Sequence, residues 1–355
     1  MKRDYYFNLA KSGLKMPIGA DLTLKGKAQP EKIVEDGAKL GEVVVETADR
    51  FKTPLAFPLM DLTVEKHWLM SALGVPAEET GSKHFSGAPS DDAVRRILAA
   101  VDAAEKPQTV RMKATCDALS YVAAKRSELV PVGMSIGPFS LMTKLLDDPI
   151  TGVFLSGMGT KAEESDEVKA VERALELSLA VILKSIRLQV KAGAKAICVC
   201  EPAANKVYIS PNQIAEGSDV FERLVVKPNL EMRKLLEELG ADLIFHDCGE
   251  LVDPMVSSFN QLDPAVMSLG GSRVLWDDAR LVSKQTVLFG NLPSKKFYSD
   301  AEITKERVAE MSKALLAKMR ETGHPFILGS ECDVLSVPGH EATILSKVDA
   351  MLSAS

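Results

Sequence analysis

The feature that most constrains this fold is a repeated alternation of short apolar runs with longer helical patterns. Each apolar run is rich in strand-forming residues, and a longer segment with helical spacing of apolar positions follows it. This order is typical of βα units, in which helices connect the strands of a parallel sheet. Seven runs are predicted strands, at residues 54–61, 130–137, 194–201, 242–248, 265–270, 286–293 and 326–332.

An eighth strand is expected near residues 82–87, although the sequence there, SKHFSG, carries only a weak strand signal. We include it because eight βα units can close into a barrel, and a closed barrel leaves no strand edge exposed. With 355 residues the chain is long enough for this arrangement. The predicted fold class is therefore α/β, a (β/α)8 TIM barrel.

The first 50 residues precede the first predicted strand and are expected to form a helical cap, which gives the barrel an N-terminal helical extension. The longest helical pattern ends at Gly193, since glycine is a common helix stop. We predict a single domain over residues 1–355. An open, doubly wound sheet is the alternative, but no glycine-rich phosphate loop follows the first strand.

Charge and hydropathy restrict the partners of this chain. The formal net charge is -6, acidic and basic residues are well mixed, and no run of lysines or arginines occurs. Binding to nucleic acid or to a membrane surface usually needs a basic patch, so neither is expected. The first residues lack the apolar core of a signal peptide, and no segment has the roughly 18 uninterrupted apolar residues of a membrane span. A cytoplasmic protein is expected.

A candidate metal site is indicated by the run ADLIFHDCGE, which begins as a buried strand and ends with His246 and Cys248. Side chains alternate faces along a strand, so these two residues point the same way. Cys332 holds the equivalent place at the end of the last predicted strand. Catalytic groups of parallel barrels lie at this end of the strands. One histidine and two cysteines there match an open zinc site with a free position for substrate or water.

Two alternatives for the cysteines remain open at this point. Five cysteines in a chain of this size make a disulfide framework unexpected. Cys248 beside His246 could be a buried thiol next to a hydrogen-bonded histidine, without any metal. Cys198 and Cys200 are a rival pair on one face of a strand, but they lie inside an apolar run, which favours inert core thiols.

Three further polar residues end predicted strands and are candidate catalytic residues. Glu201 ends the strand of Cys198 and Cys200 on the opposite face, and is a possible fourth metal ligand or acid/base. Asp61 ends the first predicted strand, where it could orient substrate or cap the following helix. Asn291 ends another strand and offers hydrogen bonds to a substrate.

Several segments together resemble the uroporphyrinogen decarboxylase superfamily over nearly the whole chain. FPLMDLTVEKHWLMSALG resembles the first strand of the family and its Asp/Glu-containing turn. PVGMSIGPFSLMTKLL resembles its Gly-Pro-Phe motif, and GAKAICVCEPAANKVYISPNQIAE resembles a segment that normally contains Gly-Ala-Asp with a later Asp-Pro. The segments IFHDCG, VLFGNLP and SECDVLSVPG complete the resemblance.

The most specific part resembles the zinc-dependent corrinoid methyltransferases, which have His-x-Cys followed far downstream by one more zinc-ligating cysteine. His246, Cys248 and Cys332 match that pattern. Two departures bear on the small substrate more than on the zinc. Glu201 stands where thiol-methylating members usually have aspartate, and GSEC replaces a more usual Pro-Gly-Cys or Gly-Cys.

The resemblance implies a zinc-dependent transfer of a methyl group between a small molecule and the cobalt of a corrinoid. The small molecule is a methylated donor such as a methoxylated aromatic, or a thiol acceptor such as coenzyme M. The usual corrinoid-binding motif Asp-x-His-x-x-Gly is absent, and the His-x-x-Gly segment HDCG belongs to the metal set. The corrinoid is therefore expected on a separate corrinoid-binding protein.

Two competing functions remain. The first is a metal-free lyase of the decarboxylase type, with Asp61 as the polar anchor of the substrate. True uroporphyrinogen decarboxylases bind their polyanionic substrate with an arginine-rich N-terminal motif, which the N-terminus MKRDYYFNLAKSGLKMPIGADLTL lacks. The second is a barrel without catalytic activity that serves as a scaffold or corrinoid-binding subunit.

Overall fold

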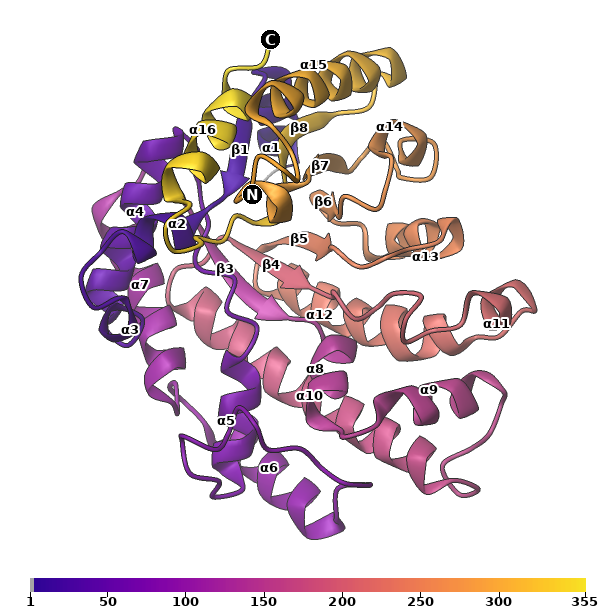
Figure 1. The fold of residues 1–355 in the computed structure, drawn as a ribbon. Helices are drawn as coiled ribbons and strands as arrows, with labels where there is room; N and C mark the ends of the chain where they lie inside the picture. Colours follow the sequence, from indigo (N-terminus) through magenta and orange to yellow (C-terminus); the bar gives the residue numbers. More distant parts are fainter. Residues whose placement is uncertain (1–2) are drawn as a thin grey trace.

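The computed structural model describes residues 3–355, and within them eight parallel strands form one curled sheet (Figure 1). The strand order is β1-β8-β7-β6-β5-β4-β3-β2, and every neighbouring pair is parallel. The strands are β1 Lys15–Ile18, β2 Leu55–Ala56, β3 Val130–Ile136, β4 Ala196–Cys200, β5 Asp242–Asp247, β6 Val266–Leu269, β7 Val287–Leu292 and β8 Phe326–Asp333. This is the α/β, TIM-barrel-like fold that the sequence predicts.

The eighth strand lies elsewhere than predicted. Residues 82–87 contain only an isolated bridge, from Phe85 to Leu146. The missing strand is β1, which pairs with β8 inside the segment expected to be a purely helical cap. Its sequence, KMPI, is short and contains Pro17, which cannot donate a ladder hydrogen bond. Proline is tolerated there because, among the described residues, β1 has a ladder on one side only.

The interior of the curled sheet is filled by side chains from all eight strands. No ladder joins β1 to β2 within residues 3–355, yet their inward residues share one apolar core with those of the other six strands. One inward side chain from each strand, in chain order, is Met16, Leu55, Val132, Cys198, Ile244, Val266, Phe289 and Ile327. Alternate residues of each strand therefore point into a packed barrel.

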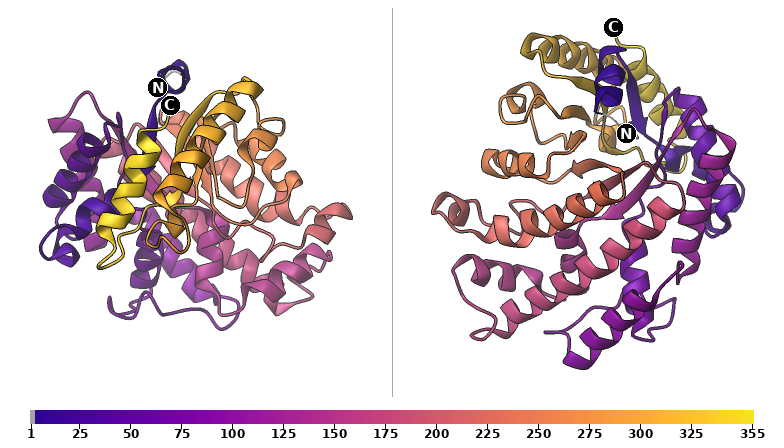
Figure 2. Two further views of the ribbon diagram at one scale, coloured as in Figure 1. Left: turned by 45° about the horizontal axis from the view of Figure 1, so that its top comes forward. Right: turned by 180° about the vertical axis from the view of Figure 1, so that it is seen from behind.

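The helices lie outside the sheet, as the two further views in Figure 2 show. They are α1 Asp4–Lys11, α2 Ala20–Lys25, α3 Pro30–Ile33, α4 Gly37–Phe51, α5 Val64–Ala72, α6 Asp91–Ala103, α7 Val110–Lys125, α8 Pro138–Leu145, α9 Pro149–Gly157, α10 Asp166–Lys191, α11 Pro211–Ala215, α12 Lys227–Glu238, α13 Asp253–Ser258, α14 Leu275–Asp278, α15 Lys305–Thr322 and α16 Glu341–Leu352. Short 3-10 turns cover Phe259–Leu262 and Ser294–Lys296, and a π-helical turn covers Glu222–Val226.

Helix ends follow local signals in the sequence. The long helix α10 begins after Ser165, whose side chain accepts a hydrogen bond from the backbone N–H of Val168. Acidic residues fill its first turn, which suits the positive end of the helix dipole. Gly193, two residues beyond its end, has a φ of 116°, a conformation that favours glycine. The predicted stop of this helix is therefore confirmed.

Helix α1 lies against the N-terminal ends of the strands. The hydroxyl of Tyr6 donates a hydrogen bond to Asp242, the first residue of β5, at 3.0 Å. Arg3 binds the backbone carbonyl oxygens of Asp263 and Gln285, which precede β6 and β7. The N-terminal segment thus contributes both a strand and a cover for the end of the barrel that lies opposite the predicted site.

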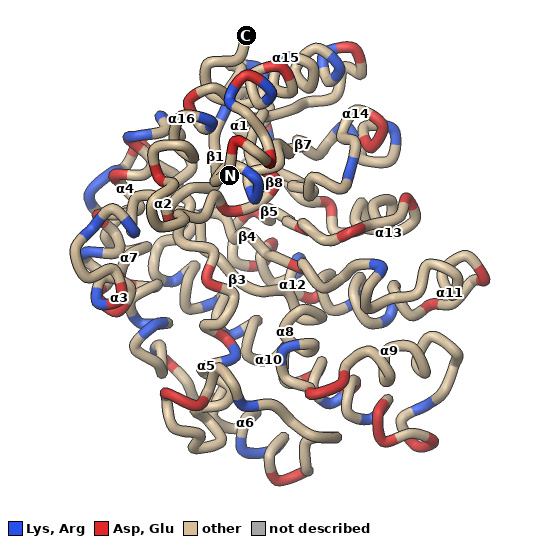
Figure 3. Tube along the Cα trace, viewed as in Figure 1, with Lys and Arg blue, Asp and Glu red and all other residues tan. Residues whose placement is uncertain are grey.

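Charged residues of both signs are interspersed along the outer helices (Figure 3). None of the helices within residues 3–355 combines the length and the apolar character that crossing a membrane requires.

Candidate metal centre

The side chains of His246, Cys248 and Cys332 converge at the C-terminal ends of β5 and β8. Each offers one ligand atom, and these three atoms all lie within 4.8 Å of one another. On β5, Ile244 faces the barrel core and Phe245 packs against the outer helices, so His246 faces inward again. Cys248 follows directly after β5. The structure thus brings together the three residues that the sequence predicts.

A register shift in β8 explains how Cys332 joins this group. Met16 pairs with Gly329 and Ile18 pairs with Asp333, so one residue of β1 opposes three residues of β8. With strict alternation from the inward Ile327, Cys332 would point away from the barrel interior. A bulge at a strand end redirects the side chains beyond it. The bulge therefore turns Cys332 toward the ligands on β5.

His246 is oriented by a residue on the neighbouring strand. Its side chain is 1% exposed, and its Nδ1 atom lies 2.9 Å from the Oγ atom of Ser268 on β6. The Nε2 atom is buried and has no hydrogen-bond partner of regular geometry among the described residues. Metal-binding histidines typically use one ring nitrogen for a hydrogen bond and the other for the metal. Nε2 is therefore the ligand atom that this arrangement offers.

The two cysteine sulfur atoms are spaced for a tetrahedral metal. The Sγ atoms of Cys248 and Cys332 lie 3.8 Å apart. Two sulfur ligands of a tetrahedral zinc ion, each about 2.3 Å from it, would lie about 3.8 Å from each other. The contact lowers the pKa of Cys332, while the same contact and burial raise the pKa of Cys248 to about 12, with His246 opposing that rise. One histidine and two cysteines with this spacing fit zinc, and they leave a fourth position for another ligand.

Glu201 does not belong to this group. It is fully buried, and its carboxylate accepts hydrogen bonds from the backbone N–H groups of Phe139 and Ser140 at 3.1 and 2.8 Å. The side chain of Asn229 donates a third bond at 2.8 Å. Because both backbone donors lie in the first turn of α8, Glu201 serves as a remote cap of that helix. We therefore do not retain it as a metal ligand or catalytic acid/base.

Asn291 also has a structural role in the fold. Its side-chain amide donates hydrogen bonds to the carbonyl oxygens of Gly270 and Arg273, at 2.8 and 2.9 Å. These residues belong to the connection between β6 and α14. The side-chain N–H groups of Asn291, expected to bind a substrate, are thus donated to backbone carbonyl oxygens. Through these bonds Asn291 holds the β6–α14 connection in place.

Asp61 forms an ion pair with Arg111 of α7, a partner that the sequence analysis missed. Its other carboxylate oxygen accepts hydrogen bonds from the backbone N–H and the hydroxyl of Thr63, at 3.1 and 2.6 Å. The Nε atom of Arg111 is buried, and no described residue offers it a hydrogen bond. An arginine on a helix surface gives no signal in sequence, because such residues are usually solvated.

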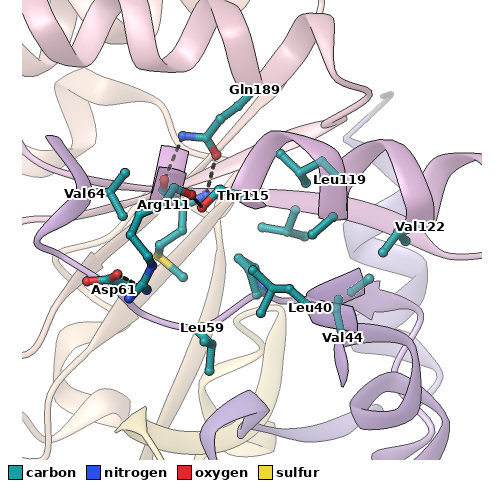
Figure 4. A pocket seen from close by; sticks show the side chains of 15 residues that line it. Leu40, Val44, Leu59, Asp61, Val64, Arg111, Thr115, Leu119, Val122 and Gln189 are labelled. Atoms are coloured by element: carbon teal, nitrogen blue, oxygen red, sulfur yellow. Dashed lines mark hydrogen bonds and ion pairs between the residues drawn. The ribbon is translucent and has the colours of Figure 1, made fainter. Parts of the chain in front are cut away.

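The Asp61–Arg111 pair lies at the edge of an apolar pocket (Figure 4). The pocket is bounded by α4, α7 and the strands β2 and β3, with Gln189 of α10 at one end. Its apolar walls are Leu40, Val44, Ala56, Pro58, Leu59, Val64, Ala118, Leu119, Val122, Val132 and Met134. Asp61 therefore faces this pocket.

Glu65, one turn beyond Asp61, is buried in the protein interior. Its Oε1 atom accepts hydrogen bonds from the hydroxyls of Ser135 and Ser185, at 3.1 and 2.8 Å, and its Oε2 atom has no hydrogen-bond partner within residues 3–355. Burial raises the pKa of this carboxyl to about 7, despite these hydrogen bonds. Glu65 thus connects β3 to α10 through α5.

Cys198 and Cys200 face the barrel core, with their Sγ atoms 3.9 Å apart. The Sγ atom of Cys200 lies 3.5 Å from the Sδ atom of Met134. The contact with Cys198 and burial raise the pKa of Cys200 well above its usual value, which favours a protonated thiol. Both cysteines are buried, as expected for core thiols.

Comparison with known proteins identifies the family. A family model described as uroporphyrinogen decarboxylase (URO-D) matches residues 20–353, which is nearly the whole chain. The chain belongs to the uroporphyrinogen decarboxylase family. The resemblance noted from the sequence is thereby confirmed at the level of this family. No curated protein matches the sequence.

Solved structures show the same fold. A methyltransferase from Methanosarcina mazei superposes with a TM-score of 0.67 and 16% sequence identity, covering 99% of this chain and 98% of that one. A B12-independent methionine synthase from Shewanella sp. W3-18-1, in complex with selenomethionine, aligns with a TM-score of 0.44 and 14% identity. That second alignment covers 67% of this chain and 65% of the synthase. At such identities the first likeness establishes the shared fold, and the second is too weak to support an argument.

Proposed function

We propose that this member of the uroporphyrinogen decarboxylase family is a zinc-dependent methyltransferase. It would move a methyl group between a small substrate and the cobalt of a corrinoid carried by a partner protein. The observation that carries this proposal is the convergence of a ring nitrogen of His246, Cys248 Sγ and Cys332 Sγ within 4.8 Å. A buried imidazole nitrogen without a regular partner, beside two sulfur atoms 3.8 Å apart, is difficult to explain by packing alone.

The residues around the site favour the binding of a divalent metal ion. Ser268 holds the His246 ring through Nδ1, which leaves Nε2 as the nitrogen that could bind a metal. Cys248 and Cys332 would bind as thiolates, and with a neutral imidazole their charges would balance those of a divalent ion. Zinc bound here would supply Lewis-acid chemistry, which lowers the pKa of a thiol or polarises an ether oxygen.

The direction of methyl transfer follows from the small substrate. For a methyl ether, the C–O bond breaks with its electron pair on oxygen, and cobalt(I) uses its own pair to form the Co–C bond. For a thiol acceptor such as coenzyme M, the thiolate attacks the methyl group of methylcobalt(III), and the electron pair returns to cobalt. We favour demethylation of a donor such as a methoxylated aromatic, because Glu201 and the GSEC segment depart from the thiol-methylating pattern.

The shared fold with the methyltransferase from Methanosarcina mazei supports this proposal. We expect the corrinoid on a separate protein, because neither His-x-x-Gly segment of the printed sequence, residues 84–87 and 246–249, has the aspartate of the usual corrinoid-binding motif. That protein would have to approach the C-terminal ends of the strands, where His246 and Cys332 lie.

Transfer of a methyl group to or from a corrinoid tests the proposal. The zinc-loaded protein is mixed with methylcobalamin and a thiol, or with cob(I)alamin and methoxylated aromatics, and the cobalamin spectrum is followed. We expect turnover that Cys332→Ser abolishes and that Cys116→Ser leaves unchanged, since Cys116 is buried outside the ligand group. Full activity of Cys332→Ser would contradict the ligand assignment. No turnover with either substrate class would favour the scaffold alternative.

A metal-free lyase is the second candidate, because the matching family model is described as a uroporphyrinogen decarboxylase. Asp61 would then anchor the substrate from the edge of the apolar pocket. In the structure this carboxylate is already paired with Arg111 and hydrogen-bonded by Thr63. Decarboxylation by protein that has been treated with a chelator would favour this candidate over methyl transfer.

A further inference from the structure

Met60 lies beside the candidate metal ligands although no sequence motif includes it. It belongs to the irregular segment between β2, which ends at Ala56, and α5, which begins at Val64. Its side chain packs against the inner core of the barrel, and its Sδ atom is 3.7 Å from the Sγ atom of Cys332. The thioether therefore lies at the end of the barrel where the ligands converge.

Two sulfur contacts of Cys332 have nearly the same length. Its Sγ atom is 3.8 Å from the Sγ of Cys248 and 3.7 Å from the Sδ of Met60. Sulfur ligands of one tetrahedral ion lie about 3.8 Å apart when each metal–sulfur bond is about 2.3 Å. Met60 thus has the spacing from Cys332 that a further ligand would need, and its thioether has the soft character of the two thiolates.

The segment that carries Met60 is held in place by its surroundings. The next residue, Asp61, forms the ion pair with Arg111 of α7. The side chain of Met60 itself packs against the inner core of the barrel. The ion pair and this packing together hold Met60 beside Cys332.

We propose that Met60 Sδ is the resident fourth ligand of the metal at this site before substrate binds, an inference that rests on the proposed function. A thioether is neutral, so it would leave the charge balance of the site unchanged. It would also occupy the position that water takes in many catalytic zinc sites, where the bound water becomes a nucleophile. Excluding water there favours methyl transfer to or from the substrate over hydrolysis.

X-ray absorption at the zinc edge tests this inference without any activity measurement. The zinc-loaded protein is measured without substrate, beside Met60→Leu and Met134→Leu. Leucine conserves the volume of methionine, so both variants should fold. Met134→Leu is the matched control, because it removes another thioether of the inner core, one that contacts Cys200.

We expect three sulfur neighbours and one nitrogen neighbour of zinc in the wild type and in Met134→Leu. In Met60→Leu one sulfur should be replaced by a nitrogen or oxygen neighbour at about 2.0 Å. Two sulfur neighbours in the wild type, unchanged in Met60→Leu, would overturn the role of Met60 and leave the proposed function standing. A wild-type protein that binds no zinc would overturn both.

Discussion

The Nδ1 atom of His246 lies 2.9 Å from the Oγ atom of Ser268, which faces it from the neighbouring strand β6. This contact leaves Nε2 as the ring nitrogen without a regular hydrogen-bond partner among the described residues, on a histidine that converges with the two cysteines. It also fixes the ring before any metal binds, because both residues are almost completely buried in the sheet.

Ser268→Ala is expected to weaken zinc binding by about 10- to 100-fold. Without its hydrogen bond to Ser268, the ring of His246 is no longer held in the orientation that suits a metal ligand. Competition with a chromophoric chelator measures the affinity. Ser178→Ala is the matched control, since that buried hydroxyl donates a hydrogen bond to the carbonyl oxygen of Ala174 within the same helix, α10. Equal zinc affinities of the two variants would show that Ser268 does not orient His246.

Glu201→Gln is expected to lower the free energy of unfolding by about 1–3 kcal/mol, because an amide cannot accept all three buried hydrogen bonds as the carboxylate does. The zinc content should stay the same. Urea denaturation and elemental analysis of one protein preparation measure both quantities. Loss of zinc in this variant would restore Glu201 as a metal ligand.

Glu65→Gln is expected to change the pH dependence of stability. Burial raises the pKa of this carboxyl to about 7 in the folded state, above its ordinary value of 4.5. Its contribution is therefore fully present below pH 4.5 and is lost as the pH rises toward 7, because the unfolded chain releases the proton first. By pH 7 the loss amounts to about 3 kcal/mol. Glutamine keeps an acceptor for Ser135 and Ser185 without this loss.

Urea denaturation of the wild type and of Glu65→Gln between pH 4.5 and pH 7 measures the effect. The variant should gain stability relative to the wild type as the pH increases. A difference that stays constant across this range would contradict the raised pKa of Glu65.

Asp61→Asn and Arg111→Gln are expected to reduce the methyl-transfer rate by similar factors, about tenfold each. Both changes break the ion pair that holds the segment carrying Met60. The double variant should be no slower than either single variant, because the two residues act through one contact. The methyl-transfer rates of the wild type, the two single variants and the double variant together form a double-mutant cycle. Multiplicative losses would show that Asp61 has a separate role in catalysis.

Much of the fold could be predicted from the sequence because seven strands lie within short apolar runs between helical segments. The eighth, β1, consists of four residues including Pro17, and only pairing with β8 makes it a strand. That pairing joins residues more than 300 positions apart, so no local pattern indicates it. The sequence of residues 82–87 has only a weak strand signal, and we include it as the eighth strand only because a closed barrel requires one.

The candidate metal ligands could be predicted in part. The period-two spacing of His246 and Cys248 predicted that both point the same way, and the structure brings them together, with Cys248 just beyond the end of β5. Strict alternation along β8 would have turned Cys332 away from them, because the bulge opposite β1 is invisible in sequence. Its place at the end of the last predicted strand and the family resemblance both indicated Cys332.

Residues with structural roles were harder to separate from catalytic ones. Alternation correctly set Glu201 on the face opposite Cys198 and Cys200, but it does not say which face looks into the barrel. The structure shows that the cysteines do, and Glu201 therefore points to α8. Met60 could not be found because its contact with Cys332 depends on the path of an irregular segment.

The zinc content of the purified protein is the most direct test of whether His246, Cys248 and Cys332 bind a metal ion. Elemental analysis is made on the wild type, His246→Ala and Cys332→Ser, all purified without chelators, with Cys116→Ser as a control for loss of a buried thiol. We predict one zinc ion per chain in the wild type and in Cys116→Ser, and none in His246→Ala and Cys332→Ser. A wild-type protein without metal would contradict it, and would make His246 and Cys248 core residues of a metal-free lyase.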